Sequence, residues 1–103
     1  MKTVTLDFFN REHFILRQEV FDFRKDRETT PWYVGYNVND AFFPIMGASM
    51  VSVLENNLQH TFSFHIFTDR YSEENKEKVK ALAQQWHCCC TLYQLHMEPF
   101  QDF

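Results

Sequence analysis

Side chains that could bind a nucleoside gather in residues 37–40, Asn-Val-Asn-Asp, directly after a short apolar run. Their carboxamide and carboxylate groups could hydrogen bond to a base or a ribose, and Phe42 could pack on the base. The alternative is that Asn39 or Asp40 only caps a following helix, because these residue types are favoured at helix N-caps. The residue pattern alone leaves both interpretations open.

A second group of chemistry-bearing side chains comprises His87, the consecutive cysteines at residues 88–90, and His96. Zinc sites use separated ligand pairs such as C-x₂-C, whereas neighbouring residues of a strand point to opposite faces. The odd number of cysteines argues against a disulfide framework, and the lack of a C-x-x-C motif argues against a small redox protein. We therefore predict reduced thiols in the core or at a sheet edge, as is usual in the cytoplasm.

Two further polar residues are better explained by local structure than by catalysis. His65 lies in an otherwise aromatic run and is predicted to be a hydrogen-bonded core histidine. Asp69 begins a predicted turn that leads into a capped helix. The two glycines, Gly35 and Gly47, cannot form a G-x-G-x-x-G or a P-loop motif. This excludes both a dinucleotide site of the first kind and a P-loop phosphate site.

Composition predicts one small globular domain in the cytoplasm. The chain has 103 residues, of which 45% are hydrophobic and 23% are charged. Its formal net charge of −4 and isoelectric point of about 5.6 disfavour binding to nucleic acid or anchoring through a polybasic patch. No run is long and apolar enough for a membrane-spanning helix, and Asp7 lies where a signal peptide would be apolar.

The elements that must position these residues follow from the periodicity. Three short runs have the alternation or the aromatic and β-branched content of strands: residues 32–36, 61–68 and 89–95. Apolar residues recur at helical spacing in residues 41–56, with Pro44 in the first turn, and again after Ser72, which is predicted to cap that helix. Gly35 and Gly47 are expected to allow close approach of a backbone or a ligand.

The order strand, helix, strand, helix, strand predicts an α/β fold with a parallel sheet and helices on both faces. Ligands bind such sheets beyond the carboxyl ends of the strands, which places residues 37–42 at the prospective site. A dense charged run at residues 24–28, followed by Pro31, predicts a boundary after residue 30, with a short helix and then an extended segment at residues 20–23 before it. Residues 31–103 are predicted to be a partial domain, because three strands are few for this architecture.

Three motifs in register resemble family 8 retaining glycosyltransferases. The run YVGYNVNDAFFPIMGASMVSVLENN, residues 33–57, resembles the first strand, turn and helix of that family. The runs FHIFTD, residues 64–69, and SEENKEK, residues 72–78, are similar to the second strand and helix of its bacterial lipopolysaccharide-core glucosyl- and galactosyltransferases. The resemblance covers residues 32–96 and implies the first β-α-β-α-β portion of a nucleotide-sugar-binding, Rossmann-like sheet of glycosyltransferase A type. It also implies that residues 1–30 are the short N-terminal extension that the lipopolysaccharide enzymes carry before their first strand.

The resemblance implies UDP-glucose or UDP-galactose as donor, Mn²⁺ or Mg²⁺ on its diphosphate, and a lipopolysaccharide-core acceptor at the cytoplasmic face of the inner membrane. It carries the uracil and ribose contacts over to Tyr36, Val38, Asn39 and Phe42. At residues 39–42 this chain has Asn-Asp-Ala-Phe, where the lipopolysaccharide enzymes have Asp-x-Asn-Phe/Tyr and the glycogenin branch has Asn-Asp-Ala-Tyr.

The family's metal-binding Asp-x-Asp does not occur in this sequence, so we expect no metal ligands and assign no catalytic residue. Without the cation, departure of the diphosphate would lose its main charge stabilisation. The expectation is therefore the N-terminal part of a retaining UDP-sugar-dependent hexosyltransferase, truncated, inactive alone and at most a weak UDP binder. The alternative is a non-catalytic interaction module whose exposed sheet edges pair with a partner chain or a second copy.

Overall fold

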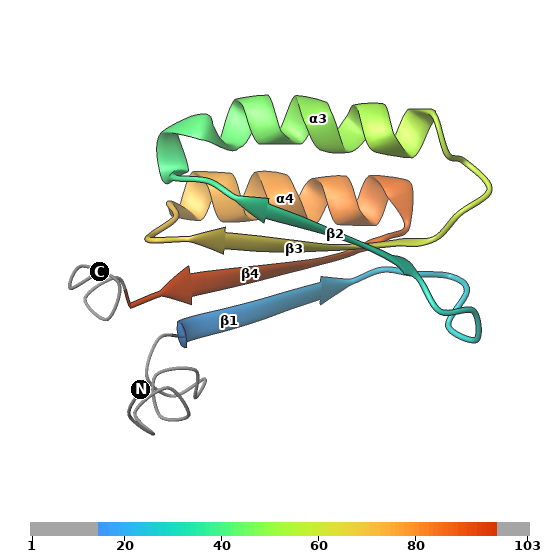
Figure 1. The fold of residues 1–103 in the computed structure, drawn as a ribbon, viewed down its shortest axis with the longest axis horizontal. Helices are drawn as coiled ribbons and strands as arrows, with labels where there is room; N and C mark the ends of the chain where they lie inside the picture. Colours follow the sequence, from blue (N-terminus) through green and yellow to red (C-terminus); the bar gives the residue numbers. More distant parts are fainter. Residues whose placement is uncertain (1–14, 97–103) are drawn as a thin grey trace, which may run out of the picture.

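The computed structural model describes residues 15–96, which form a four-stranded sheet with two α-helices lying against it (Figure 1). This is an α/β fold, as predicted from the sequence. In chain order the elements are β1 (Ile15–Asp22), β2 (Trp32–Asn37), the 3-10 helix η1 (Asp40–Phe42), α3 (Phe43–Glu55), β3 (Phe62–Thr68), α4 (Glu73–Trp86) and β4 (Cys89–Leu95).

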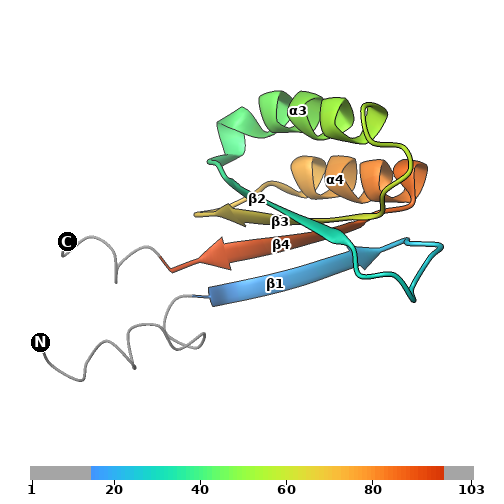
Figure 2. The ribbon, with the colours of Figure 1, turned by 45° about the vertical axis from the view of Figure 1, so that its right-hand side comes forward.

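The strands lie in the order β1-β4-β3-β2, with β2, β3 and β4 parallel and β1 antiparallel to β4. The predicted β-α-β-α-β order is confirmed. Both helices lie on the same side of the sheet (Figure 1 and Figure 2), so the expectation of helices on both faces is wrong for the described residues. The reason is that β2, β3 and β4 are added in one direction, and crossovers of one hand then place both helices on one side.

Strand β1 lies within the stretch predicted to be an N-terminal extension, yet it is part of the sheet. It pairs with β4 so that Phe21 is opposite Cys90 and Glu19 is opposite Leu92. Because the chain is a strand from residue 15 onward, the prediction of a helix there is wrong. Residues 1–14, on which the rest of that prediction falls, lie outside the described residues. The hydroxyl of Tyr71 donates a hydrogen bond to Glu19, so this charged side chain of β1 has a hydrogen-bond partner from outside the strand. The predicted domain boundary after residue 30 stays a prediction.

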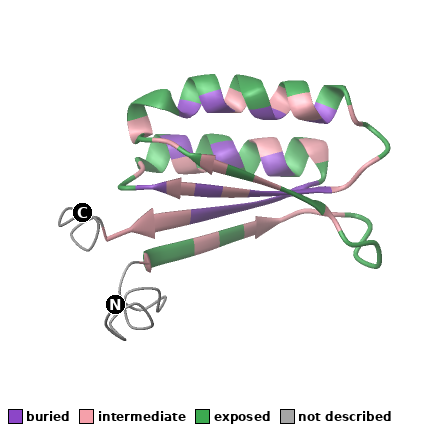
Figure 3. Ribbon diagram, viewed as in Figure 1, coloured by how far each residue is buried: buried purple, intermediate pink, exposed green. Residues whose placement is uncertain are grey.

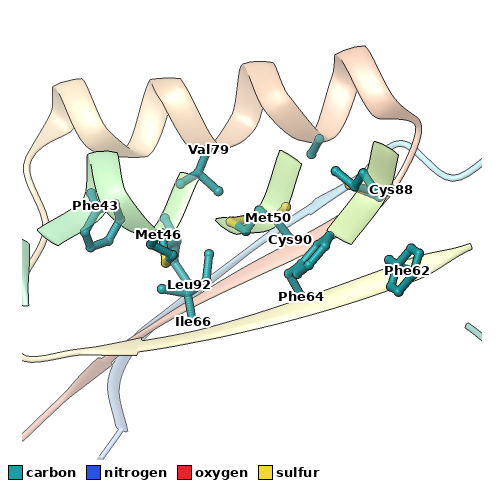
Figure 4. Packing of buried hydrophobic residues seen from close by; sticks show 12 residues of the cluster. Phe43, Met46, Met50, Phe62, Phe64, Ile66, Val79, Cys88, Cys90 and Leu92 are labelled. Atoms are coloured by element: carbon teal, nitrogen blue, oxygen red, sulfur yellow. The ribbon is translucent and has the colours of Figure 1, made fainter. Parts of the chain in front are cut away.

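The hydrophobic core fills the space between the sheet and the helices, where the buried residues concentrate (Figure 3). On β3 the alternate residues Phe62, Phe64 and Ile66 are at most 2% exposed. Met50 of α3 and Val79 of α4 point toward the strands in the same layer (Figure 4). Apolar residues at every second position of β3 and at helical spacing in α3 and α4 therefore lie on one face of each element, and that face is buried.

Helix α3 begins at Phe43 and carries Pro44 in its first turn, where the missing N–H costs no hydrogen bond. The residues that it buries recur at helical spacing: Phe43, Met46, Met50 and Leu54. The prediction that another backbone segment comes close at the two glycines is wrong among the described residues, whereas the approach of a ligand stays a prediction. A Cβ atom at Gly35 or Gly47 would meet no atom within 4 Å, so neither position requires a glycine for space.

Helix α4 begins as predicted, because the Ser72 hydroxyl accepts a hydrogen bond from the Asn75 amide at 3.1 Å. Glu74 and Lys78, four residues apart on this helix, form an ion pair at 3.0 Å. The helix ends at Trp86, and the C-cap residue His87 has a positive φ of 52°. Within residues 15–96, no helix has the length and apolar character needed to cross a membrane.

Candidate functional site

The parallel strands β2, β3 and β4 end at Asn37, Thr68 and Leu95, and these carboxyl ends share one edge of the sheet. The chain leaves β2 through Val38 and Asn39 and enters η1 and α3 without returning to the sheet. Backbone hydrogen bonds fix this passage: the Val38 amide donates to the Phe67 carbonyl at 3.0 Å. The edge predicted for ligand binding is therefore the edge at which the residue 37–42 turn lies.

A depression of about 440 Å³ lies beside this turn. It contains all four residues predicted to contact a nucleoside and four others, and its lining is Tyr36, Asn37, Val38, Asn39, Phe42, Ile45, Met46 and Ser49. The structure thus brings the predicted residues together, while their role in binding stays a prediction. Sequence reasoning missed Ile45, Met46 and Ser49. Their signal was the helical spacing from Phe42, which places them on the same side of the helix.

The walls of the depression combine an exposed apolar surface with a hydrogen-bonded polar pair. Phe42 is 51% exposed and Ile45 is 66% exposed, so apolar surface is available to a planar ring. The Tyr36 hydroxyl and the Ser49 hydroxyl lie 2.9 Å apart and hydrogen bond to each other. The Tyr36 ring also packs on Phe64, with ring centroids 6.2 Å apart, and this contact connects the wall to the core.

A second depression of about 260 Å³ lies on the other side of the turn, lined by Asn37, Val38, Asn39, Thr68, Asp69 and Leu95. Asp69 accepts a hydrogen bond from the Arg70 amide at 2.8 Å, and the Thr68 hydroxyl donates to the Arg70 carbonyl at 2.8 Å. These bonds form the predicted turn into α4. The carboxylate of Asp69 is therefore at the sheet edge, with a local structural partner.

The alternative in which Asn39 or Asp40 caps the following helix is wrong. Neither η1 nor α3 has a side-chain hydrogen bond at its N-cap. The Asp40 carboxylate instead accepts hydrogen bonds from the Asn75 side chain at 2.8 Å and the Ser72 amide at 2.9 Å, both from the beginning of α4. The hydrogen bond from Asn75 lowers the pKa of Asp40 most, and the one from the Ser72 amide lowers it further.

His65 is hydrogen-bonded, as predicted, but it is only partly buried and does not belong to the core, so the prediction of a core histidine is wrong. Its Nδ1 lies 2.8 Å from the Tyr93 hydroxyl and its Nε2 lies 3.1 Å from the Ser63 hydroxyl. Burial lowers the pKa of His65. It lies on the face of the sheet away from the helices, and no catalytic role follows from these contacts.

The three cysteines are buried free thiols. Cys90 contacts Cys88, and this hydrogen bond together with burial raises the pKa of Cys90. A raised pKa keeps the Cys90 thiol protonated, which disfavours nucleophilic and metal-binding roles for this residue. Among residues 15–96, no three His, Cys, Asp or Glu side chains are grouped so as to hold a metal ion.

The strand order and the ligand-sized depression at the carboxyl edge are those of a Rossmann-like α/β sheet. A sequence profile described as Glycosyl transferase family 8 matches residues 33–103, which is more than half of the chain. This chain belongs to glycosyltransferase family 8, and the resemblance noted from the sequence is confirmed.

Three bacterial relatives are enzymes of lipopolysaccharide synthesis by name. The lipopolysaccharide 1,3-galactosyltransferase of Salmonella typhimurium is 25% identical over 92 residues, which cover 88% of this chain and 27% of that enzyme. The lipopolysaccharide 1,2-glucosyltransferase of Escherichia coli is 32% identical over 76 residues, covering 74% of this chain and 22% of that enzyme. The lipopolysaccharide glucosyltransferase WaaO of Escherichia coli K12 is 27% identical over 86 residues, which cover 84% of this chain and 25% of that enzyme. This chain thus spans about a quarter of the length of these relatives. No solved structure matches it.

Proposed function

We propose that this chain is the nucleotide-binding segment of a retaining lipopolysaccharide-core hexosyltransferase that uses UDP-glucose or UDP-galactose in the cytoplasm. Family membership and the names of the relatives support the reaction class. The observation that carries the proposal is the depression in which Tyr36, Val38, Asn39 and Phe42 meet. Phe42 would pack on the uracil, and Asn39, which is exposed beside it, would hydrogen bond to the base or the ribose.

We further propose that the 103-residue chain binds the nucleotide without transferring the sugar. The family's Asp-x-Asp does not occur in the sequence, and the described residues offer no grouped acidic ligands. In the family a divalent cation supplies the positive charge that stabilises the departing diphosphate. The residues of this chain would then bind and orient the nucleoside, while the charge stabilisation and the acceptor pocket would have to come from elsewhere.

Calorimetric titration with UDP, with and without Mn²⁺, tests both statements. We expect binding with a Kd of about 0.1 to 1 mM, typical of a ligand held by one aromatic contact and a few hydrogen bonds, and we expect no dependence on Mn²⁺. Phe42→Ala should weaken binding about tenfold, since it removes the ring contact. Leu58→Ala is the matched control, because Leu58 is 75% exposed and lies in the connection between α3 and β3.

Two results would contradict these proposals. If the Phe42→Ala and Leu58→Ala variants bind UDP with equal affinity, the depression is not the binding site. Tight binding that requires Mn²⁺, or release of UDP from a UDP-hexose, would show that the chain holds the cation and would overturn the proposed lack of activity.

A second candidate function, pairing through a sheet edge, is favoured by the difference between the two edge strands. β1 carries Arg17, Glu19 and Asp22, and charges of this kind protect an edge from pairing. β2 has no charged residue, and its side chains Trp32 and Tyr33 are 53% and 66% exposed. We therefore propose β2 as the edge at which a second copy or a partner strand would add.

The backbone of β2 allows a specific test. The amides of Trp32 and Val38 donate toward the Thr61 and Phe67 carbonyls, so by alternation the amide of Gly35 faces away from β3. Gly35→Pro removes this outward donor and should abolish concentration-dependent association in analytical ultracentrifugation. Gly35→Ala is the control, because a Cβ there meets nothing within 4 Å. A chain that stays monomeric before any substitution would contradict pairing of two copies through β2.

A further inference from the structure

Asp40 connects the turn that lines the depression to the beginning of α4. Its carboxylate oxygen Oδ1 accepts hydrogen bonds from the Ser72 amide at 2.9 Å and from the Asn75 side-chain amide at 2.8 Å. The same Asn75 nitrogen also lies 3.1 Å from the Asp40 carbonyl oxygen. Three hydrogen bonds therefore join two segments that are more than thirty residues apart in the sequence.

These contacts complete the cap of α4 with a residue from outside the helix. In a capping box the N-cap side chain binds the third helical amide, and the third helical side chain binds back to the N-cap amide. Ser72 makes the first of these bonds, to the Asn75 amide. The second bond of the box, from the N-cap amide to the third helical side chain, is not formed. The Ser72 amide and the Asn75 side chain both donate hydrogen bonds to Asp40 instead. Asp40 thus takes the place of the acidic partner in the box.

The charge of Asp40 suits this place. A carboxylate is stabilised near a helix N-terminus by the unpaired amides and the helix dipole. Asn75 is 9% exposed, so its side-chain amide is a buried donor that requires a partner. The lowered pKa of Asp40 agrees with a carboxylate that accepts these bonds in its charged form.

The position of Asp40 matters because its neighbours line the depression. Asn39 precedes it and Phe42 follows two residues later, and both belong to the lining, whereas Asp40 and Asn75 do not. Apart from Asp40, this turn is connected to the rest of the protein through the pairing of Asn37 with Phe67, through the Val38 amide, and through packing of the Val38 side chain against the core. Within the turn, the Phe42 amide donates to the Asn39 carbonyl at 3.0 Å. The contacts of residues 37 and 38 hold the beginning of the turn, whereas the contacts of Asp40 hold the part that carries Asn39 and Phe42.

We propose that Asp40 is a positioning residue that holds the residue 37–42 turn against the N-terminus of α4 and so presents Asn39 and Phe42 to the nucleoside. This inference rests on the proposed function, since it concerns the same depression. It assigns no contact with the nucleotide to Asp40. It also makes the beginning of α4, including Ser72 and Asn75, part of what determines nucleotide affinity.

Asn75→Leu is the main test, because it removes the donor of two of the three hydrogen bonds without changing the charge or the lining of the depression. With the 103-residue chain and UDP as the probe, we expect the Kd to rise about fivefold, the loss that a missing cap contact produces. Amide exchange measured by NMR should become faster at residues 39–42. Glu74→Gln is the control, because Glu74 lies in the same helical turn and pairs with Lys78 instead.

A conservative rescue separates positioning from general stability. Asp40→Asn keeps an oxygen that can accept from the Ser72 amide, whereas Asp40→Ala keeps none. Uridine is the probe for this pair, because it has no phosphate charge to respond to the lost carboxylate. We expect Asp40→Asn to retain more uridine affinity than Asp40→Ala, at temperatures where thermal unfolding shows both variants fully folded.

The outcomes distinguish this inference from the proposed function. If the unchanged chain binds UDP and the Asn75→Leu and Asp40→Ala variants bind as tightly with unchanged exchange at residues 39–42, the positioning role is wrong and the proposed function stands. If the unchanged chain binds neither UDP nor uridine, the proposed function is wrong, and so is the presentation of Asn39 and Phe42 to a nucleoside.

Discussion

The two faces of the sheet are built from the same strands by different kinds of interaction. On the face toward the helices, Phe64 and Ile66 of β3 are fully buried among apolar side chains of α3 and α4. On the opposite face, the intervening residues His65 and Phe67 join a row of rings with Tyr93, and no described helix covers it. One face is thus stabilised by non-directional burial and the other by directed contacts.

The contacts on the opposite face are specific in geometry. The rings of Phe67 and Tyr93 are stacked with centroids 4.5 Å apart, and the Tyr93 hydroxyl lies 2.8 Å from Nδ1 of His65. Ser63 supplies the partner of the other histidine nitrogen. Among residues 15–96, no buried side-chain nitrogen or oxygen lacks a hydrogen-bond partner. The comparison teaches that the polar side chains of this sheet are accommodated where a nearby side chain, from the sheet or from outside it, provides a hydrogen-bond partner.

The largest effect is expected from opening a cavity on the helix face. Phe64→Ala removes a fully buried ring and should lower the free energy of unfolding by about 3 to 5 kcal/mol. Urea denaturation followed by circular dichroism measures this change. A loss below about 1 kcal/mol would mean that the two helices do not pack on β3 in solution.

A directed contact on the opposite face should matter less. Tyr93→Phe keeps the ring stacking but removes the hydroxyl that bonds to His65, and should cost about 1 kcal/mol. The same denaturation experiment measures it, with Tyr33→Phe as the control, because the Tyr33 ring also lies near His65, with centroids 5.6 Å apart. Equal losses in the two variants would show that the hydroxyl contact of Tyr93 is not special.

Acid should act on the opposite face through His65. Burial lowers the pKa of His65, so the unfolded chain binds this proton more readily than the folded chain does. The free energy of unfolding should therefore fall as the pH decreases below 6.5, the ordinary value, until the folded-state pKa is passed. Denaturation at about pH 7.5 and about pH 5.5 measures the slope. His65→Gln should reduce this slope, and an unchanged slope would contradict the assignment.

The smallest effect is expected at an exposed residue of the opposite face. Val20 of β1 is paired with Thr91 and is 54% exposed, so Val20→Thr should change the free energy of unfolding by less than about 0.5 kcal/mol. A loss of about 2 kcal/mol or more would show that this face is covered in solution by further chain or by a second copy, and would end the contrast between the faces.

Much of this fold was predictable because its signals are local. The predicted strand at residues 89–95 and the Ser72 cap match the structure, since alternation, helical spacing and capping depend on residues within a few positions of one another. The candidate site was predictable in the same way: the residues after β2 had to lie at the carboxyl edge once the strand was recognised. Ile45 and Ser49 were missed because the helix face that lines the depression depends on the direction in which α3 leaves the turn.

The amino-acid sequence by itself determined the types of the predicted elements after residue 31, their order and the family, because each is encoded in local patterns or in motifs. Tertiary structure alone decided that β1 pairs with β4, that both helices lie on one face, and that Asp40 caps α4 instead of its own helix. The physical reason is that these three features depend on which distant segments meet. The partner of a charged strand or a turn carboxylate can be far away in the sequence, and only the folded chain brings the two together.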